Sequence, residues 1–161
     1  MIFSPQSKVW IYQSDRQFTP TEAAEIQQKL DAFTAQWTAH GHQLKAKAEI
    51  PYNFFIVLTV DQDAASATGC SIDSSVRIIK EIETNYGVDL FNRFNMAYKI
   101  NDEVHVAAKE DFETLITIKQ IGPQTIVFNN LVQTLSEFED KWEVALEDSW
   151  HKNIFAEQLS A

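Results

Sequence analysis

The sequence has few of the residues that mark special classes of protein. It contains one cysteine, Cys70, and only four glycines and four prolines among 161 residues. A single thiol excludes an intramolecular disulfide and a cysteine-rich zinc site. The low glycine and proline content excludes a collagen-like repeat and a disordered linker. The longest apolar run, Phe54 to Val60, is much shorter than the roughly 18–20 residues that a membrane-spanning helix needs.

Basic residues are also scarce. Lys and Arg number 13 against 23 Asp and Glu, which gives a formal net charge of −10. Clustered basic residues bind phosphate backbones and anionic bilayers, so we expect neither duplex DNA nor a membrane as a partner. Apolar residues are abundant at 45%, as in a packed globular protein. The length fits one domain, and we predict a single α+β domain over residues 1–161.

Hydrophobic periodicity predicts the elements through residue 100. Lys8 to Gln13 alternates as a strand, and Thr19-Pro20 with Glu22 is typical of a helix start, with Gly41 as its stop. The same reasoning predicts strands over 44–50 and 54–58, a helix over 71–86 that Gly87 ends, and a strand over 94–100. The order β-α-β-β-α-β is that of ferredoxin-like folds, so we predict a ferredoxin-like sandwich.

The C-terminal third adds further elements. Asn101-Asp102 predicts a tight turn into a strand over 103–106, followed by a short helix over 109–118 and a brief strand over 125–128. The acidic tail from Gln133 carries Trp142 and Trp150. Trp and Phe are enriched in interface hot spots, so this tail is a candidate partner-binding surface. We favour packing on the sheet, because an exposed apolar tail promotes aggregation.

One edge of the predicted fold collects reactive side chains near the start of the second helix. Free backbone N–H groups and the positive dipole end at a helix start lower a thiol pKa and attract anions. A thiol beside imidazole and carboxylate groups can act as a nucleophile with its base and an orienting acid. The candidate catalytic residues are Cys70, His40, His42 and Asp73, and the candidate ligand-binding residues are Ser71, Ser74 and Arg77.

Burial and helix capping also explain the presence of these residues, without any catalytic or ligand-binding role. A free cysteine is usually a small buried hydrophobe. Ser71, Asp73 and Ser74 are residue types that any helix start prefers. His40-Gly41-His42 offers two imidazoles, whereas a metal site needs three or four ligands, so we expect neither metal nor cofactor.

Two phosphate-binding motifs are absent. Cysteine-based phosphatases have five residues between Cys and Arg, but six separate Cys70 from Arg77. The nucleotide-binding P-loop needs two glycines five positions apart and a lysine after the second. No pair of glycines has this spacing and none precedes a lysine, which excludes an ATPase of that class.

Several stretches resemble a family of short bacterial proteins often labelled "ABC transporter ATPase". These stretches are Trp10–Ser14, Trp37–Gly41, Gly69–Asp73, Ile126–Asn130, Trp142–Val144 and Ser149–Lys152. The resemblance extends over nearly the whole chain and carries over no functional residues. It implies a small cytoplasmic bacterial protein. The first eight residues, which lack the pattern of a secretory leader, and the unpaired cysteine favour the same compartment.

No residue pattern names a reaction, so three hypotheses stay open. The first is a small binding or interaction protein without catalysis, with a protein or a small anion as its partner. The second is a thiol-dependent enzyme or an anion site centred on Cys70. The third is ATP hydrolysis, which the family label implies and which the missing P-loop leads us to expect to fail.

Overall fold

The structure is a computed structural model that describes residues 2–63 and 65–161. It contains both helices and several small sheets, which confirms the α+β class. The chain forms two compact units. Unit 1 runs to Phe91 and includes Gln133–Glu139, and unit 2 consists of Asn92–Val132 and Asp140–Ala161. The single domain over residues 1–161 stays a prediction, because two compact units can unfold together or separately.

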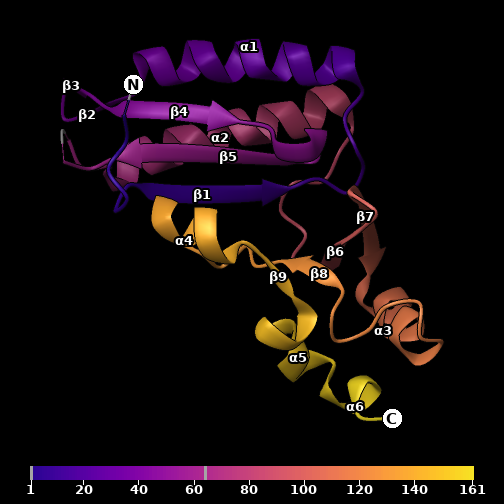
Figure 1. Cartoon of the computed structure of the whole chain (residues 1–161). Helices are drawn as coiled ribbons and strands as arrows, with labels where there is room; N and C mark the ends of the chain where they lie inside the picture. Colours follow the sequence, from indigo (N-terminus) through magenta and orange to yellow (C-terminus); the bar gives the residue numbers. More distant parts are fainter. Residues whose placement is uncertain (1, 64) are drawn as a thin grey trace. The chain divides into compact units, whose positions relative to one another are not determined.

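Unit 1 contains a three-stranded sheet in the order β1-β5-β4 (Figure 1). β1 (Lys8–Gln13) and β4 (Lys45–Glu49) both pair antiparallel with the central β5 (Phe55–Asp61), so they run parallel to each other. α1 (Pro20–Gln36) connects these two parallel strands, and α2 (Gly69–Tyr86) follows β5. This arrangement is a split β-α-β motif, and a short helical turn, η1 (Pro51–Asn53), joins β4 to β5.

The core of unit 1 lies between the helices and one face of the sheet. β5 is buried along its whole length, as its continuous apolar run predicts. The cluster between the layers includes Ile26 and Leu30 of α1, Ile56 and Leu58 of β5, and Ile79 and Ile82 of α2. Each of these six side chains is fully buried, which contributes roughly 1.5–3 kcal/mol per residue.

α1 begins as predicted but ends earlier. Thr19 caps it, and the Glu22 side chain accepts a hydrogen bond from the Thr19 N–H, which completes a capping box. The prediction that Gly41 ends this helix is wrong, because Trp37 is already extended after Gln36. A small hairpin follows, formed by β2 (Thr38–Ala39) and β3 (His42–Gln43).

Gly41 serves the turn of that hairpin. His40 and Gly41 connect β2 to β3 and have φ angles of 51° and 77°. Two successive positive φ angles characterise the type I′ turn, which favours glycine and matches the twist of the strands. Gly41 therefore lies in a hairpin turn, where the sequence predicted a helix end.

Unit 2 contains the second sheet, in the order β7-β6-β8-β9. Its antiparallel strands are β6 (Asn95–Ile100), β7 (Glu103–Ala108), β8 (Ile126–Phe128) and β9 (Glu143–Ala145). The predicted strand over 94–100 is therefore β6, between β7 and β8. The ferredoxin-like arrangement is not confirmed, because its fourth strand would have to pair beside β1.

Another segment occupies part of that place beside β1. Lys8 forms a β-bridge with Thr134, and the Val9 N–H donates to the Gln133 carbonyl at 3.0 Å. The Leu135 N–H in turn donates to the Ser7 carbonyl at 2.8 Å. α4 (Leu135–Lys141) starts directly from this pairing. A segment distant in sequence therefore extends the sheet of unit 1 where the fourth strand was expected.

Short helices surround the core of unit 2. They are α3 (Lys109–Thr117), η2 (Leu146–Asp148), α5 (His151–Ile154) and α6 (Ala156–Leu159). The core side chains include Met96, Phe112, Ile116, Val127, Leu146 and Phe155. Trp142 is only 4% exposed and packs against Phe128, with its Nε1 donating to Asn130 Oδ1 at 2.8 Å. This confirms the packing interpretation for Trp142. Among the described residues, no helix combines the length and the apolar character needed to cross a bilayer.

Candidate functional site

The start of α2 carries most of the candidate residues, and its hydroxyl groups serve the helix itself. Thr68 is the N-cap: the Ser71 N–H donates to Thr68 Oγ1 at 3.4 Å, and the Thr68 N–H donates to Ser71 Oγ at 2.7 Å. The Ser71 hydroxyl also donates to the Thr68 carbonyl at 2.8 Å. Ser74 Oγ donates to the Cys70 carbonyl at 3.1 Å. Two of the three candidate ligand-binding residues therefore hold their hydroxyls in local hydrogen bonds.

A buried hydrogen bond joins the end of α1 to the start of α2. The Trp37 indole Nε1–H donates to the Ser71 carbonyl at 2.8 Å, and β2 contacts α2. The elements that carry the histidines and Cys70 are thus brought to one edge, as the topology predicts. We call residues 37–43 and 68–77 together the α2 edge.

The candidate reactive side chains of the α2 edge all face solvent. Cys70, His40, His42, Asp73 and Arg77 are exposed. The structural interpretation of Cys70 as a small buried hydrophobe is therefore wrong. Within residues 2–63 and 65–161, none of these five side chains has a hydrogen bond or an ion pair with another. The edge brings the backbone segments together without joining nucleophile, base and acid.

Metal-ligating groups do not gather at the α2 edge. In the part of the chain that the structure describes, no three His, Cys, Asp or Glu side chains lie close enough to hold an ion together. His40 and His42 flank Gly41 at the hairpin turn, where both imidazoles are exposed.

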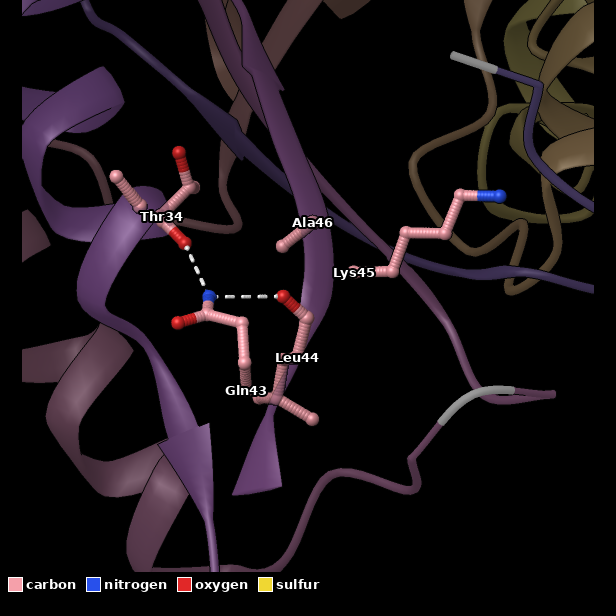
Figure 2. A pocket seen from close by; sticks show the side chains of 6 residues that line it. Thr34, Gln43, Leu44, Lys45 and Ala46 are labelled. Carbon is pink, nitrogen blue, oxygen red and sulfur yellow. Dashed lines mark hydrogen bonds between the residues drawn. The ribbon is translucent and has the colours of Figure 1, made fainter. Parts of the chain in front are cut away.

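An open hollow of about 730 Å³ lies beside the α2 edge (Figure 2). Its lining residues come from the end of α1 and from β3 and β4, and they are Thr34, Ala35, Gln43, Leu44, Lys45 and Ala46. The Gln43 amide donates to the carbonyls of Thr34, Trp37 and Leu44 at 3.2, 3.2 and 3.0 Å. These carbonyls belong to the last turn of α1, to its C-cap and to the residue before β4, so the amide joins the three segments. The Lys45 side chain extends away from Gln43 (Figure 2) and pairs with Asp61 at 3.4 Å.

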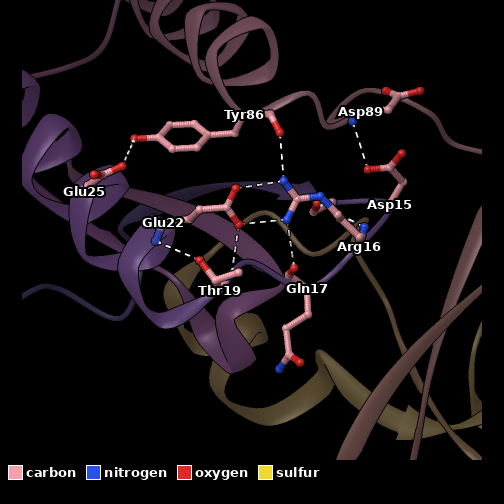
Figure 3. Close-up of polar contacts among 9 residues, drawn as sticks. Asp15, Arg16, Gln17, Thr19, Glu22, Glu25, Tyr86 and Asp89 are labelled. Atoms are coloured by element: carbon pink, nitrogen blue, oxygen red, sulfur yellow. Dashed lines mark hydrogen bonds and ion pairs between the residues drawn. The ribbon is translucent and has the colours of Figure 1, made fainter.

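A polar cluster links the start of α1 to the end of α2 (Figure 3). The Arg16 guanidinium binds both carboxylate oxygens of Glu22 at 2.8 and 2.9 Å and donates to the Tyr86 carbonyl at 2.8 Å. The hydrogen bonds from Arg16 and then from the Thr19 N–H lower the pKa of Glu22 to about 2. The Tyr86 hydroxyl donates to Glu25 at 3.0 Å. Every charge in this chain of contacts has a partner, so the cluster is a clamp between two helices.

Sequence reasoning missed a buried pair of one serine and one histidine in unit 2. Ser149 Oγ and His151 Nδ1 lie 2.7 Å apart, and both residues are at most 3% exposed. Burial lowers the pKa of His151 to about 4, and its ring stacks on Trp150 at 3.9 Å. A serine two residues before a histidine is the only sequence signal. The pair is closed to substrate, so its role is to hold the chain at the start of α5.

Comparison of this chain with protein-family models, with curated proteins and with solved structures finds no match. The resemblance to the family labelled "ABC transporter ATPase" therefore stays a prediction. Functional assignment has to rest on the geometry of the α2 edge itself.

Proposed function

We propose that the protein is a small binding or interaction protein that acts without catalysis, through the α2 edge. One observation carries this proposal: Cys70, His40, His42 and Asp73 each face solvent without a hydrogen bond to one another within the described residues. A general base has to reach hydrogen-bonding distance of its nucleophile. An open surface of mixed polar groups suits a macromolecular partner better than an enclosed small-molecule reaction.

The proposed binding surface is the α2 edge and not the C-terminal tail. Trp142, the strongest hot-spot candidate of that tail, is buried against Phe128 and has its indole N–H bonded. Exposed groups of the α2 edge include two imidazoles, a thiol, a carboxylate and a guanidinium. A protein partner is the favoured ligand, and a small anion that contacts Arg77 is the alternative.

Cys70 allows a direct experiment, because it is the only thiol and it is exposed. A photo-crosslinker on Cys70 should capture a discrete partner in a native lysate. The matched control carries Cys70→Ser and Ser160→Cys, which moves the label to another exposed position. Capture by the Cys70 label alone supports the proposal. Identical products from both labels, or none from either, would contradict it.

A thiol-dependent reaction is the second candidate, and the position of Cys70 favours it. Cys70 is exposed in the first turn of an 18-residue helix, where the dipole stabilises a negative charge. If His40 or His42 acts as its base, replacing both histidines with Gln should slow the alkylation of Cys70 by roughly tenfold or more. Full general-base catalysis accelerates a reaction by roughly 10²–10⁴-fold. An unchanged rate would remove this candidate and leave the binding function.

ATP hydrolysis in the bacterial cytoplasm, which the family label implies, is the weakest candidate. The sequence has no P-loop, and it also lacks a signature segment of the Leu-Ser-Gly-Gly-Gln kind that such ATPases carry. We expect no binding of ATP with or without Mg²⁺ in equilibrium dialysis. Saturable ATP binding would overturn this expectation.

A further inference from the structure

The outer edge of β7 is a regular, unprotected strand edge. β7 pairs with β6 over all six of its residues, without a bulge. Within the described ranges, no strand pairs with its other side, since β7 ends the sheet order. Natural proteins protect such edges with proline, lysine or bulges within the strand. β7 contains none of these; its one formally charged residue, Glu103, stands at the end beside the turn, and Val104 and Val106 are half-buried.

The turn between β6 and β7 determines which backbone groups point outward. Asn101 and Asp102 both have positive φ angles, 53° and 66°, as in a two-residue type I′ turn. The residues that flank such a turn, Ile100 and Glu103, form a hydrogen-bonded pair, and bonded and non-bonded pairs then alternate. Residues 103, 105 and 107 therefore direct their N–H and C=O groups to β6. Residues 104, 106 and 108 direct theirs to the open edge.

We propose that two copies of this chain associate by pairing β7 with β7, antiparallel, around a two-fold axis. A ladder forms only where outward-pointing residues face each other. Centring the pairing on Val106 satisfies this condition: Val106 faces Val106 of the second copy, and Val104 faces Ala108. Centring it on His105 also satisfies it, but then two imidazoles face each other.

Charge selects between these two registers. Glu103 and Lys109 are the only residues with a formal charge between 103 and 109. Centring on Val106 brings Glu103 opposite Lys109 of the second copy, and it does so twice because of the two-fold symmetry. The Glu103 side chain is 79% exposed and the Lys109 side chain 39%. Within one copy Lys109 pairs with Glu113 at 3.1 Å, so in the dimer it shares its charge between Glu113 and Glu103 of the second copy. Lys109 is the first residue of α3 and follows the extended Ala108 directly, so it lies at the end of the ladder and not within a strand. Attraction between the opposite charges of Glu103 and Lys109 at this end favours this register.

The self-complementarity of this segment argues for a second copy over a foreign strand. Val106 faces Val106, Val104 faces Ala108, Ala107 faces the neutral His105, and Glu103 faces the oppositely charged Lys109. The two sheets would join edge to edge into one continuous sheet. Edge pairing buries little surface, so we expect a dimer that forms at high concentration and dissociates on dilution.

Sedimentation velocity of the full chain tests the dimer at protein concentrations of roughly 1–500 μM, the range in which a weak complex forms. The expected result is a mass that rises toward that of two copies. Val106→Pro removes an outward N–H without removing a bond to β6, so it should keep the monomer folded by circular dichroism and abolish the mass increase. A monomer at every concentration, or a dimer that survives Val106→Pro, overturns the proposal.

Charge exchange provides a test that leaves the backbone unchanged. Glu103→Lys alone and Lys109→Glu alone each place like charges opposite one another, and should weaken the dimer about tenfold. An equal mixture of these two variants restores both attractive pairs in the mixed dimer. The mixture should therefore dimerise more strongly than either variant alone. A mixture that behaves as the average of its components would exclude this register.

Discussion

At the scale of single residues, Trp37 connects the elements of the α2 edge. Its indole is 3% exposed, donates to the Ser71 carbonyl and lies between the rings of Phe33 and Trp10, at 5.0 and 6.1 Å. The sequence places Trp37 on the apolar stripe of the first helix. In the structure it is the first residue beyond that helix, with an extended backbone at φ −75° and ψ 123°.

Trp37→Phe should lower the free energy of unfolding by about 1–2 kcal/mol, because it removes a buried hydrogen bond. Trp10→Phe is the matched control: Trp10 is half-buried, and its indole has no hydrogen bond among the described residues. Urea denaturation of both variants measures the difference. Equal losses in the two variants would mean that ring volume alone determines the effect.

His151 should make stability depend on pH. Its folded pKa of about 4 lies below the unfolded value of 6.5, so between these values the unfolded chain binds a proton that the folded chain does not. Stability is therefore complete above pH 6.5 and falls toward pH 4, by up to about 3 kcal/mol. Unfolding free energies between pH 5 and 7 should show this slope in the natural chain. The slope should disappear in His151→Gln.

Glu22 acts in a lower pH window. Its folded pKa of about 2 lies below its ordinary value of 4.5, so the clamp with Arg16 contributes fully above pH 4.5. That contribution is lost as the pH falls from 4.5 toward 2, when the folded carboxylate takes up a proton. Measurements above pH 5 therefore isolate the effect of His151.

At the scale of elements, the sequence predicted the strand bounds and helix starts that neighbouring residues determine. β1 has the predicted bounds, and the capping box of Thr19 and Glu22 places the start of α1. The β2–β3 hairpin was missed because its strands have only two residues each, and the apolar spacing that predicts the helix continues as far as Trp37. β9 and α5 were missed because each has only three or four residues, too few for a periodic pattern. The α2 edge was predicted from topology, but the side-chain directions on it follow from packing.

The glycines at element ends allow a matched test. Gly87 ends α2 with a φ of 62°, and a Cβ there would meet no atom within 4 Å. Gly87→Ala should therefore destabilise by about 1 kcal/mol through backbone strain alone. Gly69→Ala has equal space but lies in the first turn of α2 without a positive φ. It should stabilise by up to about 1 kcal/mol, and opposite signs in thermal unfolding would confirm the assignment.

At the scale of the whole molecule, unit 1 is discontinuous in sequence. Gln133–Glu139 belongs to it and pairs with the edge of β1. Removing residues 134–161 should therefore expose the β1 edge and unfold the protein, as judged by circular dichroism. Removing only residues 156–161, which contain no fully buried side chain, should leave both units folded. A well-folded 1–133 fragment would show that β1 does not need this segment.

The late position of Gln133–Glu139 also has a consequence for synthesis on the ribosome. β1 is among the first elements to leave the exit tunnel, and the segment that covers part of its edge leaves only after Asn92–Val132, the first part of unit 2. Throughout that interval the nascent chain carries an incomplete sheet margin, which is a binding motif for chaperones and a risk for pairing between neighbouring nascent chains. Slow translation through residues 92–132 would lengthen this exposure, and the yield of native protein should depend on codon choice there more than in the first ninety codons.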